Sequence, residues 1–190
     1  MKLVRFAENG TARYGVLDGD IVRPTDATTL QDALAITGLD ALPVPLKTLD
    51  LLAPVERPRK ILGIGVNYAA HAAESVSFVD TKSPQVQKWF NKQATSANKP
   101  FGRVHLPKVS DQLDYEVELV VVIGKHGRHV PRERAMEIVA GFCVGCDYSV
   151  RDWQRASQTM IMGKGFDTHA PFGPALVTPD EIEDLASVEL

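Results

Sequence analysis

The most regular hydrophobic pattern of the chain runs over residues 114–124, where charged positions give way to a run of apolar, mostly β-branched residues. This pattern predicts a β-strand. Side chains alternate between the two faces of a strand, so Glu116 and Glu118 share a face with the valines that follow. Two carboxylates are costly to bury without a cation, a shared proton or an arginine partner. The apolar run favours burial and a divalent metal, although an edge strand with a solvated face is the alternative.

The start of the chain shows the alternation and turn residues of short β-hairpins. Turn formers lie at residues 8–10 and at Asp18-Gly19, between stretches of strand-like alternation. Thr29 is placed to cap a short helix over residues 30–37, and Gly38 is placed to end it. These features predict a small N-terminal module with strands and one helix.

The proline-rich stretch over residues 39–58 is typical of a linker. We therefore predict a small module over residues 1–55 and a main domain over residues 56–190. Strands outnumber helices in the whole pattern, which predicts an α+β fold that is mostly β. In the main domain the patterns predict strands over 59–66, 89–91, 141–150 and 175–178, short helices over 132–140 and 153–160, and a loop over 163–173.

Composition narrows the class of protein. The chain has 190 residues, of which 44% are hydrophobic and 24% charged, so it can bury a substantial core. Its formal net charge of -3 gives no support to nucleic-acid binding. The sequence contains no apolar run long enough to span a membrane, and its start turns polar too soon for a signal peptide. We expect a cytoplasmic protein with no membrane or nucleic-acid partner.

The chain contains only two cysteines, Cys143 and Cys146, in a C-x-x-C spacing. This spacing can indicate a redox pair or half of a zinc site. Here it falls within a predicted strand, where positions three apart face opposite ways, and no second cysteine pair is present to complete a zinc site. We expect both cysteines to be structural.

Asp147 follows the strand that carries the cysteines. An aspartate at a strand end is commonly a cap or turn residue. Together with Glu116 and Glu118 it would form a site of three carboxylates, which suits a hard cation such as Mg²⁺ or Mn²⁺, with Ca²⁺ also possible.

Three further features could carry chemistry. His71 and Glu74 stand three apart on an alanine-rich helical turn, a pairing suited to a general base, or equally to an exposed polar face. Lys164 lies between two glycines in a predicted flexible loop, where it could reach an anion or be solvated. Gly63-Ile-Gly65 follows a strand but lacks the third glycine of a dinucleotide-binding loop.

Several segments, in one order along the chain, together resemble the fumarylacetoacetate hydrolase family. The likeness extends over about residues 50–184, and the earlier residues resemble the small N-terminal module that many members carry. The segments are Gly65-Val-Asn-Tyr-Ala-Ala-His-Ala-Ala-Glu74, Phe90-Asn-Lys-Gln93, Leu113-Asp-Tyr-Glu-Val-Glu-Leu119, Ile123-Gly-Lys125, Asp147-Tyr-Ser-Val-Arg-Asp-Trp-Gln154, Gly163-Lys-Gly-Phe-Asp-Thr168 and Pro171-Phe-Gly-Pro174.

This resemblance implies a metal-centred active site in a β-rich fold, a homodimer, and a small oxo-acid substrate. It implies cleavage of a C–C bond in 2,4-dioxo acids of the acylpyruvate or fumarylpyruvate type. The alternatives are decarboxylation or isomerisation by the same family (of oxaloacetate or 2-hydroxyhepta-2,4-diene-1,7-dioate type), or a non-catalytic, truncated relative. The roles carried over are Mg²⁺ or Mn²⁺ binding by Glu116, Glu118 and Asp147, water activation by His71 and Glu74 on a lid, and substrate contact by Lys164, Gln154 and Lys92.

The sequence departs from the family pattern at three places. Cys146 stands where asparagine is common, before Asp147. Residues 63–65 supply no extra carboxylate, so water would take that ligand position. The family normally continues past the position of Leu190 with further strands that close the substrate pocket, so we expect a catalytic fold that is incomplete at its C-terminal part.

Overall fold

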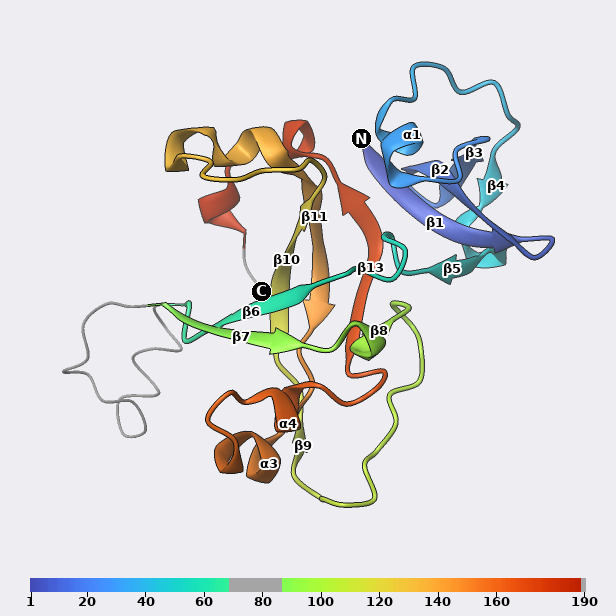
Figure 1. Ribbon diagram of the computed structural model, residues 1–190. Coiled ribbons are helices and arrows are strands. Elements are labelled where there is room, and N and C mark those ends of the chain that lie inside the picture. The colour runs from blue at the N-terminus through green and yellow to red at the C-terminus, as the bar shows by residue number, and fades with distance from the viewer. Residues whose placement is uncertain (69–86, 189–190) are drawn as a thin grey trace.

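The protein is a mostly β structure, described here by a computed structural model for residues 1–68 and 87–188 (Figure 1). The strands are β1 Lys2–Glu8, β2 Thr11–Asp18, β3 Ile21–Pro24, β4 Val44–Pro45, β5 Asp50–Leu52, β6 Ile61–Gly65, β7 Lys88–Lys92, β8 Ala97–Asn98, β9 Leu113–Asp114, β10 Val117–Ile123, β11 Val139–Cys146, β12 Ser149–Val150 and β13 Ala170–Val177. The α-helices are α1 Leu30–Leu34, α3 Arg151–Ala156 and α4 Ile161–Lys164, and the 3₁₀ turns are η1 Leu46–Thr48, η3 Ala94–Ser96, η4 Arg132–Ile138, η5 Pro179–Glu181 and η6 Leu185–Ser187.

One large sheet organises the chain, in the order β10-β11-β13-β1-β2-β3-β4. Its neighbouring strands are antiparallel, while β5 pairs with β1 and β8 pairs parallel to β13 off this path. Two smaller two-stranded sheets are β12-β9 and β6-β7, and β6 and β7 cross β10 and β11 in the view of Figure 1. Because β1 lies against β13, the N-terminal strands continue the sheet of the main domain. The division near residue 55 therefore stays a prediction.

The predicted hairpins and helix cap are present. Asn9 and Gly10 both have positive φ, at 50° and 79°, which is the geometry of the tight turn that fits the twist of a β-hairpin. Thr29 accepts a hydrogen bond at its hydroxyl from the backbone N–H of Asp32, as a helix cap does. The helix is shorter than expected, because Ala35 rather than Gly38 follows its last residue as the C-terminal cap.

The proline-rich stretch is only partly a linker, which corrects the expectation for residues 39–58. It contains β4, which pairs with β3, and β5, which pairs with β1. Proline lacks the N–H that a central strand would need, and β4 with its Pro45 is the last strand of the sheet. Pro45 is therefore accommodated at an edge.

The helical segments differ most from the sequence pattern. Helix α3 ends at Ala156, earlier than expected, and the helix expected over 132–140 is the 3₁₀ turn η4 followed by the start of β11. The loop expected over 163–173 instead holds the end of α4 and the first half of β13. Among the described residues, no helix has the length and apolar character needed to cross a membrane.

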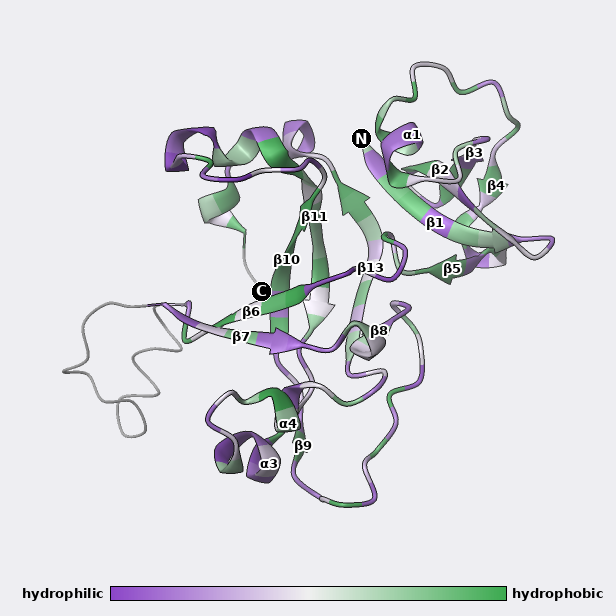
Figure 2. Cartoon of the chain, viewed as in Figure 1, coloured by the Kyte–Doolittle hydropathy of each residue, from purple (hydrophilic) through white to green (hydrophobic). Residues whose placement is uncertain are grey.

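Hydrophobic residues concentrate along β10, β11 and β13 and along β1 (Figure 2). The two faces of β1 lie in separate core clusters, with Leu3 in one and Phe6 in the other. Tyr14, which belongs to the same cluster as Leu3, donates a buried hydrogen bond of 2.9 Å from its hydroxyl to the Pro54 carbonyl. Burial raises the pKa of Tyr14 to about 12, so the phenol stays protonated and can serve as this donor.

The strand that carries the glutamates has the expected inner face. Val122 is buried, and Glu118 on the same face is half-buried, while Val117 and Val121 on the other face are exposed. The strand begins later than predicted, however, since β10 starts at Val117. Glu116 lies in the short connection between β9 and β10, where its backbone carbonyl accepts a 2.7 Å hydrogen bond from the N–H of Asp147.

Both cysteines are free and lie on β11. Cys143 is buried, and burial raises the pKa of its thiol to about 12. At pH 8 such a thiol is ionised in only about one molecule in 10,000, and the thiolate is the reactive form.

We therefore expect Cys143 to resist Ellman's reagent at pH 8 in the folded protein and to react once guanidinium unfolds it. The Cys143→Ala variant identifies its contribution to the titration. Rapid reaction of Cys143 in the native protein would contradict the buried position.

Candidate active site

Four charged side chains meet between β7, the end of β11 and α4. We call Lys92, Glu116, Asp147 and Lys164 the carboxylate–lysine cluster. The Lys164 ammonium donates to Asp147 at 2.6 Å and to Glu116 at 2.7 Å. The Lys92 ammonium donates to the other oxygen of Asp147 at 2.6 Å. Both oxygens of Asp147 are thus held by lysines.

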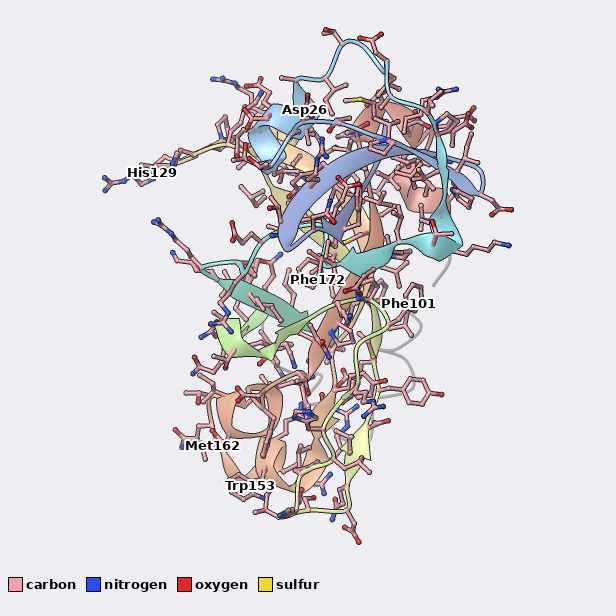
Figure 3. All side chains as sticks on the ribbon, turned by 90° about the vertical axis from the view of Figure 1, so that its right-hand side faces the viewer. Asp26, Phe101, His129, Trp153, Met162 and Phe172 are labelled. Carbon is pink, nitrogen blue, oxygen red and sulfur yellow. The ribbon has the colours of Figure 1, made fainter. Side chains whose placement is uncertain are left out.

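The local sequence explains how these groups come together. Lys92 is the last residue of β7, and Asp147 directly follows β11. Helix α4 packs closely on α3, since a Cβ built at Gly163 would lie only 2.3 Å from the backbone nitrogen of Gln154. Glycine is therefore required beside Lys164, and the two helices lie at one end of the molecule (Figure 3).

The cluster is largely removed from water. The side chains of Lys164, Lys92 and Asp147 are 2%, 4% and 8% exposed, and that of Glu116 is 19% exposed. Charges buried to this degree are tolerated only when they are paired and hydrogen-bonded. The Lys164 ammonium also lies 4.7 Å from the centre of the Phe90 ring, a favourable cation–π position.

Lys164 is the clearest correction to the local sequence pattern. It was expected in a flexible loop, where it could be solvated, but it is the last residue of α4 and almost fully buried. Two glycines flank it, and local propensity alone favours a loop there. A buried helical position is favoured instead by the ion pairs of Lys164 with Glu116 and Asp147 and by the packing of α4.

The pKa shifts follow from burial opposed by charge pairing. Burial lowers the pKa of Lys92, and the Asp147 carboxylate opposes this shift, so the ammonium depends on that partner. Burial alone would raise the pKa of Glu116, but Lys164, Ser149 and Arg151 lower it below its ordinary value. Glu116 is therefore ionised at neutral pH.

Glu118 lies near the cluster without joining it by a hydrogen bond in the described residues. Burial raises its pKa, repulsion from Asp147 and Glu116 adds to the shift, and a hydrogen bond from Tyr68 opposes it. The Tyr68 hydroxyl also accepts from the backbone N–H of Leu119, at 3.2 Å. Burial and the two neighbouring carboxylates thus disfavour the charged form of Glu118.

Arg151 and Ser149 were not singled out as site residues, although both lie in the segment that begins at Asp147. Arg151 pairs with Glu116 at 3.0 Å and with Asp114 at 2.8 Å, and it donates to the side-chain carbonyl of Gln154 at 2.9 Å. Ser149 donates to Glu116 at 2.5 Å. The sequence offered one signal for them, which is a hydroxyl two residues after Asp147 and an arginine four residues after it.

The other expected site residues have different outcomes. In the described part of the chain Gln154 reaches the cluster only through Arg151, so its contact with substrate stays a prediction. His71 and Glu74 lie outside the described residues, and their role as a water-activating pair stays a prediction too.

The three expected metal ligands fit a hard cation by their chemistry. Glu116, Glu118 and Asp147 offer carboxylate oxygens, the donors that Mg²⁺ and Mn²⁺ prefer, on segments joined by a backbone hydrogen bond. Within residues 1–68 and 87–188, no three His, Cys, Asp or Glu side chains are grouped as a ready-made metal site. The two lysines instead hold the Asp147 oxygens, and the ligand set stays a prediction.

Comparison with known proteins identifies the family of the chain. Residues 60–190 match the family described as "Fumarylacetoacetate (FAA) hydrolase C-terminal", and residues 1–54 match "Rv2993c-like, N-terminal". The human "Oxaloacetate tautomerase FAHD2A, mitochondrial" is 45% identical over 146 residues, which cover 75% of this chain and 45% of the relative. Its Bos taurus counterpart is 44% identical over 185 residues, covering 96% of this chain and 52% of the relative. The chain thus spans about half the length of these curated relatives.

Solved structures of similar proteins share the fold of this chain. A fumarylacetoacetate hydrolase from Exiguobacterium antarcticum has a TM-score of 0.80 at 31% identity, with 96% of this chain and 68% of that chain covered. A 5-carboxymethyl-2-hydroxymuconate delta-isomerase from Mycobacterium smegmatis has a TM-score of 0.77 at 30% identity, with 94% of this chain and 67% of that chain covered. The chain belongs to the fumarylacetoacetate hydrolase family, a family of enzymes.

Proposed function

We propose that this chain supplies the catalytic core for metal-dependent enol–keto chemistry on a small 2-oxo dicarboxylic acid of the oxaloacetate type, as a tautomerase, decarboxylase or isomerase. Two curated relatives at 44–45% identity are named oxaloacetate tautomerases, and a structural neighbour is named an isomerase. These names favour the alternative activities over the hydrolysis of 2,4-dioxo acids. The observation that carries the proposal is the buried carboxylate–lysine cluster.

The proposed metal ligands are Glu116, Glu118 and Asp147, holding Mg²⁺ or Mn²⁺. When bound, the cation would supply Lewis-acid polarisation of the 2-oxo group of the substrate. An ammonium group has three N–H donors, and Lys164 uses two of them in its hydrogen bonds to Glu116 and Asp147. The third is available to a substrate oxygen on which negative charge develops.

The reaction itself needs little from the protein beyond positioned charge and proton transfer. Tautomerisation moves a proton between the carbon next to the oxo group and the oxo oxygen. Decarboxylation releases CO₂ from the same carbon, which then takes a proton. Neither requires an attacking water, so the predicted His71–Glu74 pair would serve proton transfer in these reactions and water activation only in hydrolysis.

Hydrolysis of a dioxo acid is the second candidate, supported by the similarity to the fumarylacetoacetate hydrolase from Exiguobacterium antarcticum. In that reaction water attacks the distal carbonyl, and the C–C bond breaks to leave an enolate. We also propose that the protein is cytoplasmic, as its sequence suggested, and a homodimer, as the family resemblance implied.

The test is an assay of oxaloacetate enolisation and CO₂ release with Mg²⁺, with Mn²⁺ and with excess EDTA, alongside a 2,4-dioxo acid. We expect turnover of oxaloacetate that needs the metal and falls at least about a hundredfold in Glu116→Gln, since a ligand matters more than the outer partners whose loss costs 10–100-fold. The exposed control Glu137→Gln should leave the rate unchanged, because Glu137 pairs only with Arg134 among the described residues. Metal-dependent turnover of the dioxo acid alone would assign hydrolysis instead, and full rates in EDTA would refute both.

A further inference from the structure

Two fully buried polar side chains beside the active site each have an atom without a hydrogen-bond partner in the described residues. Ser96, at the end of η3, and His169, just before β13, are both 0% exposed. The Ser96 hydroxyl and the Nδ1 atom of His169 have no hydrogen-bond partner in the described part of the chain. A buried polar atom without a partner is destabilising, so native proteins rarely retain one.

The pairing of β8 with β13 brings these two residues close together. β8 and β13 are parallel, with Ala97 beside Ala170. One step earlier in both segments stand Ser96 and His169. A step before that, the backbone N–H of Thr168 donates to the Thr95 carbonyl at 3.4 Å, so the two segments stay adjacent on both sides of the pair. Ser96 ends the 3₁₀ turn η3 and His169 directly precedes β13, so the backbone contacts before and after the pair hold the two residues close together.

The other ring nitrogen fixes which proton His169 carries. Its Nε2 atom lies 2.9 Å from the carbonyl oxygen of His105, and a carbonyl can only accept, so Nε2 bears the proton. The ring is also held by stacking on Phe166, with centroids 5.3 Å apart. Burial lowers the pKa of His169, which keeps the ring neutral. Nδ1 is then an acceptor, and the Ser96 hydroxyl is a donor without another partner among the described residues.

We infer that the Ser96 hydroxyl donates to Nδ1 of His169, and that this buried bond positions the Lys92–Asp147 ion pair. The backbone carbonyl of His169 accepts from the N–H of Tyr148, directly after Asp147, at 3.0 Å. The carbonyl of Tyr148 in turn accepts from the Lys92 ammonium at 3.0 Å. Ser96 and His169 therefore tie the segment after β7 to the segment after β11.

A double-mutant cycle tests the bond directly. We expect Ser96→Ala to raise the unfolding equilibrium constant about tenfold in the wild-type background. In a His169→Phe background, which keeps a stacked ring but removes the acceptor, the same change should have almost no effect. In a Val22→Ala background, a buried site in another core cluster, the tenfold effect should return, because independent sites add. A tenfold effect in all three backgrounds would overturn the bond.

A spectroscopic measurement on the unmodified protein tests it even where His169→Phe fails to fold. ¹⁵N NMR should show His169 as the Nε2–H tautomer, and Ser96→Ala should shift its Nδ1 resonance. A protonated Nδ1 in the folded protein, or an Nδ1 resonance unmoved by Ser96→Ala, would refute the assignment.

The positioning role rests on the proposed metal-dependent function and has its own readout. Calorimetric titration with Mn²⁺ should show about tenfold weaker binding in Ser96→Ala, as for loss of an outer partner of a ligand. Unchanged Mn²⁺ affinity together with an intact cycle would overturn the positioning role. Absence of Mn²⁺ binding by the wild type would instead refute the proposed function and leave the cycle and the NMR result standing.

Discussion

Lys164→Met is expected to lower the free energy of unfolding by about 3–5 kcal/mol, the loss typical of breaking a buried ion pair. Methionine nearly preserves the length of the side chain but removes the ammonium, which is 2% exposed and bridges Glu116 and Asp147. The two carboxylates then lose their shared counter-charge. Denaturant titration of the metal-free protein measures the loss, and the variant should have no detectable turnover of oxaloacetate.

The matched control is Lys99→Met, which removes an ion pair of similar length at the surface. Lys99 lies 2.7 Å from Asp50, but both side chains are exposed, so the expected loss is at most about 1 kcal/mol. Saturating Mn²⁺ should recover part of the stability lost in Lys164→Met, because a cation can take over the charge between the carboxylates. Equal losses in the two variants would contradict the buried bridge.

Asp147→Asn should weaken Mn²⁺ binding by more than about a hundredfold, since even outer partners of metal ligands contribute ten- to a hundredfold. The amide keeps the size of the side chain but supplies neither the charge nor the second oxygen acceptor. It also leaves Lys92 and Lys164 buried without the carboxylate that each contacts at 2.6 Å. Calorimetry with Mn²⁺ measures affinity, and denaturant titration measures the accompanying loss of stability.

Asp26→Asn is the control for this prediction. Asp26 is fully exposed and pairs only with Arg13 among the described residues, and it lies at the opposite end of the molecule from α3 (Figure 3). Its Mn²⁺ affinity should equal that of the wild type. An Asp147→Asn protein that binds Mn²⁺ as tightly as this control would remove Asp147 from the ligand set.

Strands and their turns were predictable where the local pattern agreed with the tertiary environment. The turn at Asn9 and Gly10 needs positive φ at both positions, and those two residue types tolerate it. The inner face of β10 followed from its alternation, because only one register buries the valines. Helix lengths were less predictable, since short helices such as α3 and α4 depend on packing more than on propensity.

The candidate site, too, could be predicted only in part from the sequence. Its residue types could be selected from sequence, since acidic pairs and a lysine between glycines are unusual near apolar strands and the family segments contain them. Their interaction partners could not be predicted from the sequence, because Lys92 and Asp147 are 55 positions apart. Only the fold brings the Lys92 ammonium within 2.6 Å of the Asp147 carboxylate. Arg151 was missed for the same reason.

The sequence alone determined the β-rich class, the hairpin turns, the helix cap at Thr29 and the family segments, because each depends on neighbouring residues or on a repeat of two. The tertiary structure decided that Lys164 is buried and that Glu116 and Asp147 share its ammonium. It also decided that β8 pairs with β13, which brings Ser96 close to His169. These are interactions between distant segments, whose free energy depends on burial and charge pairing, and no local pattern records which segments will meet.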